Sequence, residues 1–232
     1  MVNQIEVIED HGQLYARAVE IIAEQLKDGA KVFGLATGGT MLPLYEQIRE
    51  SDIDFTQCTS FNLDEYVGLA KEHPESYHRY MDEQLFHSKP FKHSFLPDGQ
   101  TQNSQAEAQR YEALLKGKRQ DFQLLGLGEN GHIGFNEPGT AFTSETHIVQ
   151  LQKSTREANA RFFNSIDEVP SYAITMGIHS ILRAKKILVI ALGEKKRAAL
   201  EALSSGTQTE QIPATSLQNH PNVIVLTDIH IG

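Results

Sequence analysis

Short apolar segments alternate with amphipathic segments along most of the chain. The apolar segments have the length and composition of buried strands, whereas the segments between them space their apolar residues by three or four, as an amphipathic helix does. Residues 10–27 follow the helical pattern, because Leu14, Ala18, Ile21 and Ile22 fall on one face. This alternation predicts an α/β fold, in which a largely parallel sheet is covered by helices on both faces.

The same patterns assign an extent to each expected element. The expected strands are residues 32–35, 58–63, 122–125, 146–151, 171–176, 186–192 and 223–226. The expected helices are residues 10–27, 42–49, 74–86, 106–116, 177–182 and 193–203, with a further helix opening at residues 154–157, whose hydroxyls and carboxylate suit a capped start. No repeat, low-complexity tract or linker interrupts the pattern, so residues 1–232 are expected to form one domain.

Composition and charge narrow the classes of function. The 232 residues are 40% hydrophobic and 22% charged, as in globular proteins, and the net charge of -9 disfavours a nucleic-acid-binding surface. The only cysteine, Cys58, cannot form an intramolecular disulfide, which fits a reducing compartment. The first residues lack the layout of a signal peptide, and no apolar run approaches the ~20 residues of a membrane span. We therefore expect a cytoplasmic protein with no nucleic-acid or membrane partner.

A glycine-rich stretch, residues 126–138, follows the apolar residues 122–125. Its glycines prevent a helix or strand from continuing and allow the backbone to approach a ligand closely. Asn130, His132 and Glu137 lie within this stretch. An imidazole can transfer a proton, and a neighbouring carboxylate can orient it. The alternative is an ordinary glycine-rich connection that carries a surface histidine.

A second glycine-containing turn comprises Thr37, Gly38, Gly39 and Thr40, between an expected strand and an expected helix. Backbone amides at a helix start point outward and the helix dipole favours negative charge, so such a turn suits an anion. The turn is neither a Walker A loop nor a dinucleotide-binding G-x-G-x-x-G motif. A tight strand-to-helix turn without any ligand is the alternative.

Charged residues follow two further expected strands. Asp64 and Glu65 come directly after one of them, where either could instead cap a helix. Lys196 follows the most apolar strand, and Arg161 lies on the helix that opens at residues 154–157. Both basic residues could bind an anion, although Lys196 could also serve solubility because its neighbours are basic.

These unusual segments each follow an expected strand of a parallel sheet. In such sheets ligands bind beyond the carboxyl ends of the strands. The hydroxyls, amides, carboxylates, imidazole and lysine should therefore meet at one edge. The predicted ligand is a small anion with polar groups, such as a sugar phosphate.

The motifs in combination resemble those of glucosamine-6-phosphate deaminases, also called glucosamine-6-phosphate isomerases. The resemblance extends from about residue 30 to the end of the chain and rests on residues 37–40 (TGGT), 61–69 (FNLDEYVGL), 72–77 (EHPESY), 131–138 (GHIGFNEP) and 156–163 (REANARFF). It implies a modified Rossmann-like three-layer fold and no metal or other cofactor. The implied reaction converts glucosamine 6-phosphate and water to fructose 6-phosphate and ammonia, a step of amino-sugar catabolism.

The resemblance also implies a role for each site residue. Asp64 resembles the base that moves a proton between C2 and C1, His132 the group that opens the pyranose ring, and Glu137 the carboxylate that orients His132. Asn130 stands where some family members carry Asp, and an amide cannot carry charge. The implied phosphate site comprises Thr37, Gly38, Gly39, Thr40, Arg161 and Lys196. A carboxylate that abstracts a proton from carbon should be desolvated, so we expect Asp64 to have a pKa above the usual ~3.9.

The chain departs from the larger, allosteric members of this family. His147 and Val149 stand where basic allosteric residues would be expected, and the chain ends soon after its last expected strand. These departures predict a non-allosteric enzyme that is a monomer or a weak homo-oligomer. By resemblance, residues 151–171 are expected to act as a mobile lid.

Two other functions remain open at this point. A 6-phosphogluconolactonase shares the fold and has a similar Gly-His loop, although residues 64–66 and 135–138 favour the deaminase. A sugar-phosphate sensor is a rival from another class, but a sensor has no need of both Asp64 and His132. The net charge also disfavours an attached DNA-binding function.

Overall fold

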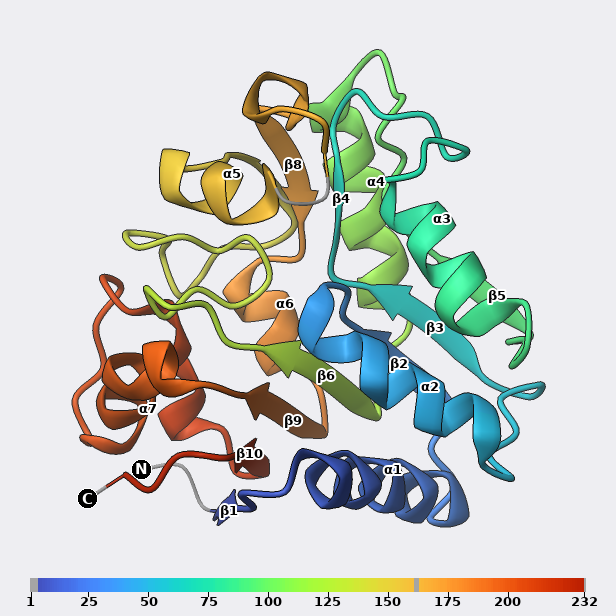
Figure 1. Cartoon of the computed structure of the whole chain (residues 1–232). Helices are drawn as coiled ribbons and strands as arrows, with labels where there is room; N and C mark the ends of the chain where they lie inside the picture. Colours follow the sequence, from blue (N-terminus) through green and yellow to red (C-terminus); the bar gives the residue numbers. More distant parts are fainter. Residues whose placement is uncertain (1–3, 161–162, 232) are drawn as a thin grey trace.

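A seven-stranded sheet forms the centre of the molecule, and every strand pair in it is parallel (Figure 1). The computed structural model describes residues 4–160 and 163–231. The strand order is β1-β10-β9-β6-β2-β3-β5. The strands are β1 (Gln4–Val7), β2 (Val32–Leu35), β3 (Thr59–Asn62), β5 (His93–Phe95), β6 (Phe122–Gly126), β9 (Lys186–Ala191) and β10 (Val223–Thr227). Because these strands all run in one direction, their carboxyl ends share one edge of the sheet.

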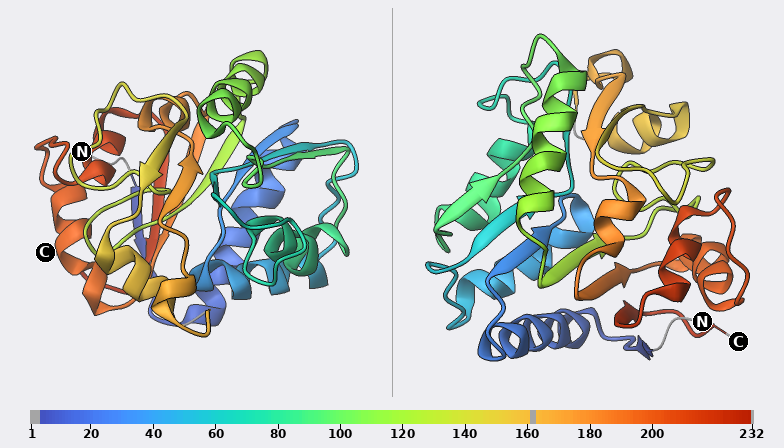
Figure 2. Two further views of the ribbon diagram at one scale, coloured as in Figure 1. Left: turned by 90° about the horizontal axis from the view of Figure 1, so that it is seen from above. Right: turned by 180° about the vertical axis from the view of Figure 1, so that it is seen from behind.

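Helices cover both faces of this sheet, with α1 and α2 on one face and α4 and α6 on the other (Figures 1 and 2). The helices are α1 (His11–Lys27), α2 (Leu42–Glu50), α3 (Tyr77–Met81), α4 (Ser104–Gly117), α5 (Lys153–Asn159), α6 (Ile178–Leu182) and α7 (Arg197–Ser204). The layered, parallel arrangement confirms the α/β fold class predicted from the alternating pattern.

A second sheet contains three antiparallel strands in the order β4-β8-β7. Its strands are β4 (Asp64–Tyr66), β7 (His147–Gln150) and β8 (Tyr172–Thr175). Only Leu63 separates β4 from β3, and Asp64 pairs with Thr175 across β4 and β8. The small sheet therefore holds Asp64 at the carboxyl end of β3. Hydropathy does not predict β4, because two of its three residues are acidic.

Several helix boundaries differ from the predicted ones for identifiable reasons. The Asp10 side chain caps α1 by accepting a bond from the Gln13 amide at 2.8 Å. The helix expected over residues 74–86 begins only at Tyr77, after the Ser76 cap, and its last turn, Asp82–Phe86, is π-helical. The capped start predicted at residues 154–157 is wrong, because α5 begins at Lys153 and the preceding Gln152 makes no side-chain capping bond.

The core lies between the central strands and the helices that cover them. Phe33 packs against Phe122 at 5.9 Å between ring centroids, and Phe61 stacks on Phe95 at 5.0 Å. Tyr111 of α4 contacts Phe61 and donates its hydroxyl to the Asn62 carbonyl at 2.7 Å. Burying each such side chain contributes about 1.5–3 kcal/mol to the free energy of folding. This packing holds the strands in register and so fixes the position of their carboxyl ends. Among the described helices, none is long and apolar enough to span a membrane.

Candidate active site

Four neighbouring strands of the large sheet lead into the segments that the sequence singles out. Strand β9 leads into residues 193–196, and β6 leads into the glycine-rich stretch, residues 126–138. Strand β2 leads into residues 37–40, and β3 leads into residues 64–65. Because the strands are adjacent and parallel, these segments converge at one edge, as the sequence predicts. Arg161, the remaining predicted phosphate ligand, lies outside the described residues.

A hydrogen-bonded relay runs through the glycine-rich loop. Asn130 Oδ1 accepts from the His132 backbone amide at 3.1 Å and lies 2.7 Å from His132 Nδ1. The Asn130 Nδ2 group donates to Glu137 Oε2 at 2.9 Å. His132 Nδ1 is 3.9 Å from that same Glu137 oxygen, so the Asn130 amide mediates the link between the imidazole and the carboxylate.

The donors in this relay also assign the histidine tautomer. A carboxylate only accepts hydrogen bonds, so the Asn130 amide must direct its NH2 toward Glu137 and its oxygen toward His132. Nδ1 of His132 then carries the proton, and in the neutral ring Nε2 is left as the proton acceptor.

The backbone of the loop is shaped around the imidazole. A side chain at Gly128 would place its Cβ 2.3 Å from His132 Nδ1, so only glycine accommodates the ring in this position. Gly131 and Gly134 adopt positive φ angles of 81° and 57°, which L side chains rarely adopt. The glycines therefore position His132 as well as interrupting regular structure.

Burial sets the charge state of His132. Its side chain is 26% exposed, and desolvation lowers the pKa of the imidazole below its ordinary value. Glu137 opposes this pKa shift, whereas the positive charge of Lys196 reinforces it. His132 is therefore neutral at pH 7, and Lys196 is close enough to act on it electrostatically.

Asp64 lies against the same loop. A Cβ on Gly134 would be 3.5 Å from Asp64 Oδ2, which shows that the loop packs on the carboxyl group. Asp64 is 6% exposed, and burial together with the charge of Glu65 raises its pKa to about 8. The raised pKa agrees with the expectation for Asp64 and makes its ionised carboxylate a stronger base than an ordinary aspartate.

Glu65 has a different role from its neighbour. Its oxygens accept from the amides of Tyr66, Tyr77 and His78 at 2.8–3.0 Å, and Oε2 is 2.8 Å from His78 Nδ1. Glu65 thus caps the amino end of α3 from a distant strand, as the helix-cap alternative allowed for this acidic pair. Its fixed charge lies beside Asp64.

Tyrosine hydroxyls hold the predicted anion-binding turn. Tyr80 donates to the Gly38 carbonyl and Tyr15 donates to the Thr40 carbonyl, each at 2.8 Å. Gly38 has a φ of 102°, which favours glycine, and a 3₁₀ turn, Gly39–Met41, leads into α2. The loop after β9 is held in a similar way, because Asp228 accepts from the Gly193 amide at 2.9 Å.

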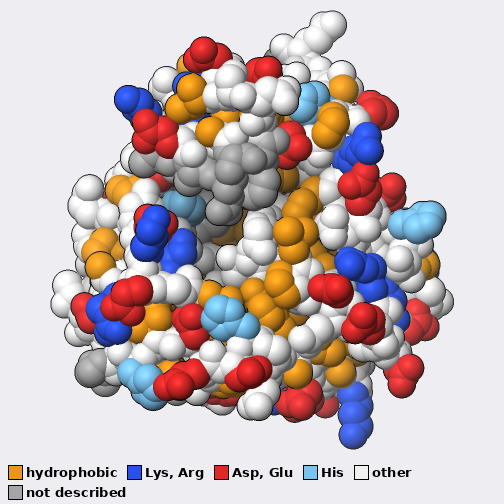
Figure 3. All heavy atoms as spheres, viewed as in Figure 1, with side chains coloured by type: hydrophobic (Ala, Val, Ile, Leu, Met, Phe, Trp, Pro, Cys, Tyr) orange, Lys and Arg blue, Asp and Glu red, His pale blue; other side chains and the backbone are white. Residues whose placement is uncertain are grey.

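Figure 3 shows a hollow near the middle of one face, with Lys and Arg side chains on one side of it and hydrophobic side chains on the other. Within the described residues, no group of three or more His, Cys, Asp or Glu side chains is arranged to hold a metal ion.

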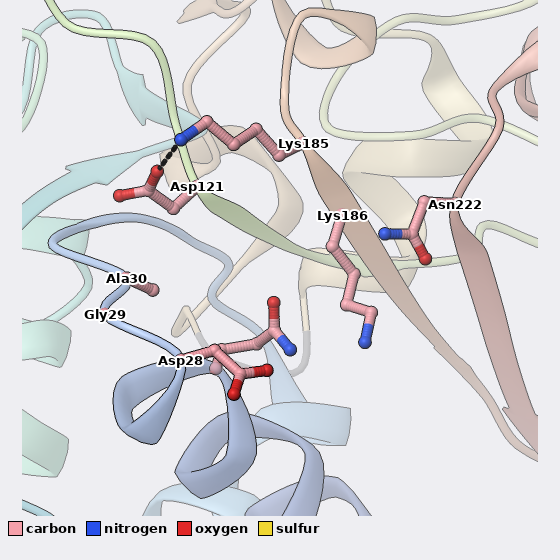
Figure 4. A pocket seen from close by; sticks show the side chains of 8 residues that line it. Asp28, Gly29, Ala30, Asp121, Lys185, Lys186 and Asn222 are labelled. Carbon is pink, nitrogen blue, oxygen red and sulfur yellow. Dashed lines mark hydrogen bonds and ion pairs between the residues drawn. The ribbon is translucent and has the colours of Figure 1, made fainter.

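Two cavities are lined by other residues. A cavity of about 150 Å³ lies at the opposite ends of the strands, where Lys185 points toward Asp121 and their Nζ and Oδ1 atoms are 2.7 Å apart (Figure 4). Another, of about 600 Å³, lies beside α3 and includes His78 and Arg79. None of the predicted site residues lines either cavity.

Most of the sequence matches one protein family. The profile described as glucosamine-6-phosphate isomerases/6-phosphogluconolactonase covers residues 9–225. The chain belongs to this family. A family relative from Lysinibacillus sphaericus, named glucosamine-6-phosphate deaminase, is 61% identical over 206 residues, which are 89% of this chain and 93% of the relative. The glucosamine-6-phosphate deaminase of Lactobacillus delbrueckii subsp. bulgaricus is 52% identical over 225 residues, which are 97% and 96% of the two chains.

Solved structures of the isomerase/lactonase family agree with the fold. A monomeric glucosamine-6-phosphate deaminase superimposes with a TM-score of 0.93 at 42% identity, covering 97% of this chain and 96% of that one. The 6-phosphogluconolactonase of Thermotoga maritima reaches a TM-score of 0.78 at 19% identity, covering 97% of this chain and 98% of that one. At that identity the lactonase shows the shared fold alone.

One contact in the site has no signal in the sequence. The hydroxyl of Thr155, on α5, donates to Glu137 Oε1. Eighteen residues separate the two side chains, and no periodicity or motif spacing links them. Sequence reasoning assigned the residues around Thr155 to a helix cap instead.

Proposed function

We propose that this protein is a glucosamine-6-phosphate deaminase, which converts glucosamine 6-phosphate and water to fructose 6-phosphate and ammonia. Relatives that are 52% and 61% identical carry this name. The observation that carries the proposal is the packing of the His132 loop on the buried carboxyl group of Asp64. The reaction needs two different proton-transfer groups against one sugar, and this contact brings the loop that carries His132 against Asp64.

Ring opening is the step that suits His132. The neutral imidazole takes the proton of the C1 hydroxyl at Nε2 and returns a proton to the ring oxygen, which breaks the bond from C1 to that oxygen. Asn130 and Glu137 keep the other nitrogen protonated, so the ring presents the correct face. The product is the open-chain aldehyde, still carrying its amine at C2.

Isomerisation and loss of ammonia follow from Asp64. The ionised carboxylate removes the C2 proton and delivers a proton to C1, while a proton passes from the amine nitrogen to the C1 oxygen. C1 is thereby reduced to an alcohol and C2 is oxidised to an imine. Water then adds to C2, and ammonia leaves as the C–N bond breaks. The net consumption of water at a carbon–nitrogen bond makes the overall reaction hydrolytic, although its first half is an isomerisation.

The phosphate group would occupy the turn of Thr37, Gly38, Gly39 and Thr40. Lys196 lies close enough to the imidazole to affect its pKa, so a phosphate held by Lys196 would anchor the same sugar. We assign Arg161 to the phosphate as well, on the family resemblance alone. Such anchoring converts binding energy into orientation of C1 and C2.

Regulation and assembly are proposed to be simple. A relative that is 42% identical is described as monomeric, which supports a monomeric or weakly associating chain here. We also propose hyperbolic kinetics without allosteric activation and a mobile lid over residues 151–171. A sigmoidal substrate curve relieved by N-acetylglucosamine 6-phosphate would contradict the first point, and equal B-factors in that segment with and without ligand would contradict the second.

The proposed function is tested by measuring deamination of glucosamine 6-phosphate and hydrolysis of a lactone with the same protein. Purified protein is incubated with glucosamine 6-phosphate, and ammonia and fructose 6-phosphate are measured in parallel with hydrolysis of 6-phosphogluconolactone. We expect ammonia and fructose 6-phosphate in equal amounts and no lactone hydrolysis above the spontaneous rate. Lactone hydrolysis without ammonia release would contradict the proposal and would identify the protein as a 6-phosphogluconolactonase instead.

The pH dependence of kcat/KM should report the buried Asp64. Because its pKa is raised to about 8, only the minority ionised form is active at pH 7, and kcat/KM should rise with pH until it levels above about pH 8. The titration of the substrate amine, followed by NMR without enzyme, is the control. A profile that is already flat from about pH 6 upward would contradict the assignment of Asp64.

Replacing Gly128 with alanine should displace His132 without unfolding the chain. The new Cβ would lie 2.3 Å from Nδ1, so the imidazole must move, and a misplacement of about 1 Å can cost ~10²-fold in rate. We expect kcat to fall about tenfold to a hundredfold. Gly117→Ala is the matched control, because nothing lies within 4 Å of a Cβ there. Equal kcat values for the two variants would contradict the described packing.

A further inference from the structure

Helix α5 contacts the proton relay through one side chain. The Thr155 hydroxyl donates to Glu137 Oε1, and the two residues are 6% and 5% exposed. The other oxygen of the carboxylate, Oε2, accepts from Asn130 at 2.9 Å. Glu137 is thus held from two sides, by the glycine-rich loop and by α5.

The three hydrogen bonds of this relay all point toward Glu137. Thr155 and Asn130 both donate to Glu137, and Nδ1 of His132 donates to Asn130. Two donors thus hold the two carboxylate oxygens of Glu137, and the Asn130 amide held in this orientation leaves His132 protonated on Nδ1. Removing the hydroxyl of Thr155 would free one carboxylate oxygen, so that Glu137 could rotate away from Asn130.

Helix α5 also bonds to the other half of the site. Asn159 donates to the Tyr66 hydroxyl at 2.9 Å, and Tyr66 is two residues from Asp64. Arg156 donates to the carbonyls of Ile166 and Val169 at 2.9 and 3.0 Å, which ties α5 to the chain that follows it. The helix consequently bridges the relay and strand β4.

We propose that Thr155 is a positioning residue for ring opening, whose hydroxyl orients Glu137 and thereby couples the placement of α5 to the alignment of His132. This inference rests on the proposed deaminase function and specifies how its proton relay is held. Thr155 itself does not touch the reacting atoms. Its effect reaches them through Glu137, Asn130 and His132.

The test replaces the hydroxyl with a group of the same shape. Thr155→Val should lower kcat on glucosamine 6-phosphate about tenfold to a hundredfold, since it leaves one oxygen of a buried carboxylate without its donor, whereas KM should change less. Thr155→Ser should restore most of the activity because it restores the donor. Thr140→Val is the matched control, because Thr140 donates at 2.7 Å to the backbone carbonyl of Glu137 rather than to its carboxylate.

A second measurement separates positioning from a general structural role. If ring opening becomes the slow step, the isotope effect of deuterium at C2 on kcat/KM should shrink toward one in Thr155→Val. It should stay at the wild-type value in Thr155→Ser and Thr140→Val. If Thr155→Val fails to fold, Thr155→Ala is judged by the same criteria.

The outcomes are distinct for the two proposals. Wild-type protein that releases no ammonia overturns the deaminase function. Active wild-type protein with a Thr155→Val variant of normal kcat overturns only the role of Thr155. The same holds if the variant is slow but keeps its full C2 isotope effect, or if serine does not restore activity.

Discussion

Asp64→Asn is expected to lose at least about 10²-fold in kcat/KM and to become more stable. General-base catalysis typically contributes 10²–10⁴-fold, and an amide cannot take the C2 proton. Asp52→Asn is the control, because Asp52 is an exposed carboxylate and its loss should change neither property. A variant with near-normal turnover would show that Asp64 is not the base.

The gain in stability follows from the direction of the pKa shift. Asp64 has a pKa of about 8 in the folded protein and, like free aspartate, ~3.9 in the unfolded chain. Between these values the folded state retains a proton that the unfolded state releases, so the cost to folding grows as pH rises from about 4 to about 8. At pH 7 this cost is on the order of a few kcal/mol.

Denaturant unfolding at several pH values measures this cost. Asparagine carries no charge to desolvate, so the difference in the free energy of unfolding between Asp64→Asn and wild type should increase from pH 5 to pH 8. The Asp52→Asn control should show no such trend. A variant that is less stable than wild type at pH 8 would contradict the burial described for Asp64.

His132→Ala is expected to lose at least about 10²-fold on the cyclic substrate and to recover most of its activity on an open-chain form. An analogue that lacks the C4 and C5 hydroxyls can close neither a furanose nor a pyranose ring and provides that form. In the proposed mechanism His132 acts in ring opening and not at C2, so a substrate that is already open has no need of it. His87→Ala, which removes an exposed imidazole, is the control. Equal losses on both substrates would contradict the assigned role.

The fold and the convergence of the site could be predicted from the sequence for a physical reason. Apolar runs such as residues 122–125 and 186–192 are shielded from water on both faces when they form strands of a sheet that helices cover on both sides. Parallel strands place their carboxyl ends together, so His132 and Lys196 had to approach one edge. These conclusions depend on local patterns and on chain direction.

The remaining features depend on contacts between distant segments. Strand β4 exists because Asp64, Glu65 and Tyr66 pair with β8, and hydropathy gives no sign that two acidic residues are buried. The position of Asn130 between His132 and Glu137 depends on loop geometry, since all three lie within eight residues and several arrangements are compatible with that spacing. The bond from Thr155 to Glu137 depends on how α5 packs, which no local pattern encodes.

The most direct measurement follows a deuterium label at C2 of glucosamine 6-phosphate by NMR. With wild-type protein, we expect the label to leave C2 and to appear at C1 of fructose 6-phosphate or in solvent, at the rate at which ammonia is released. With Asp64→Asn, we expect the label to remain at C2 even after ring opening. Loss of the label from C2 at a normal rate in Asp64→Asn would contradict the central claim that the buried carboxylate beside the His132 loop removes that proton.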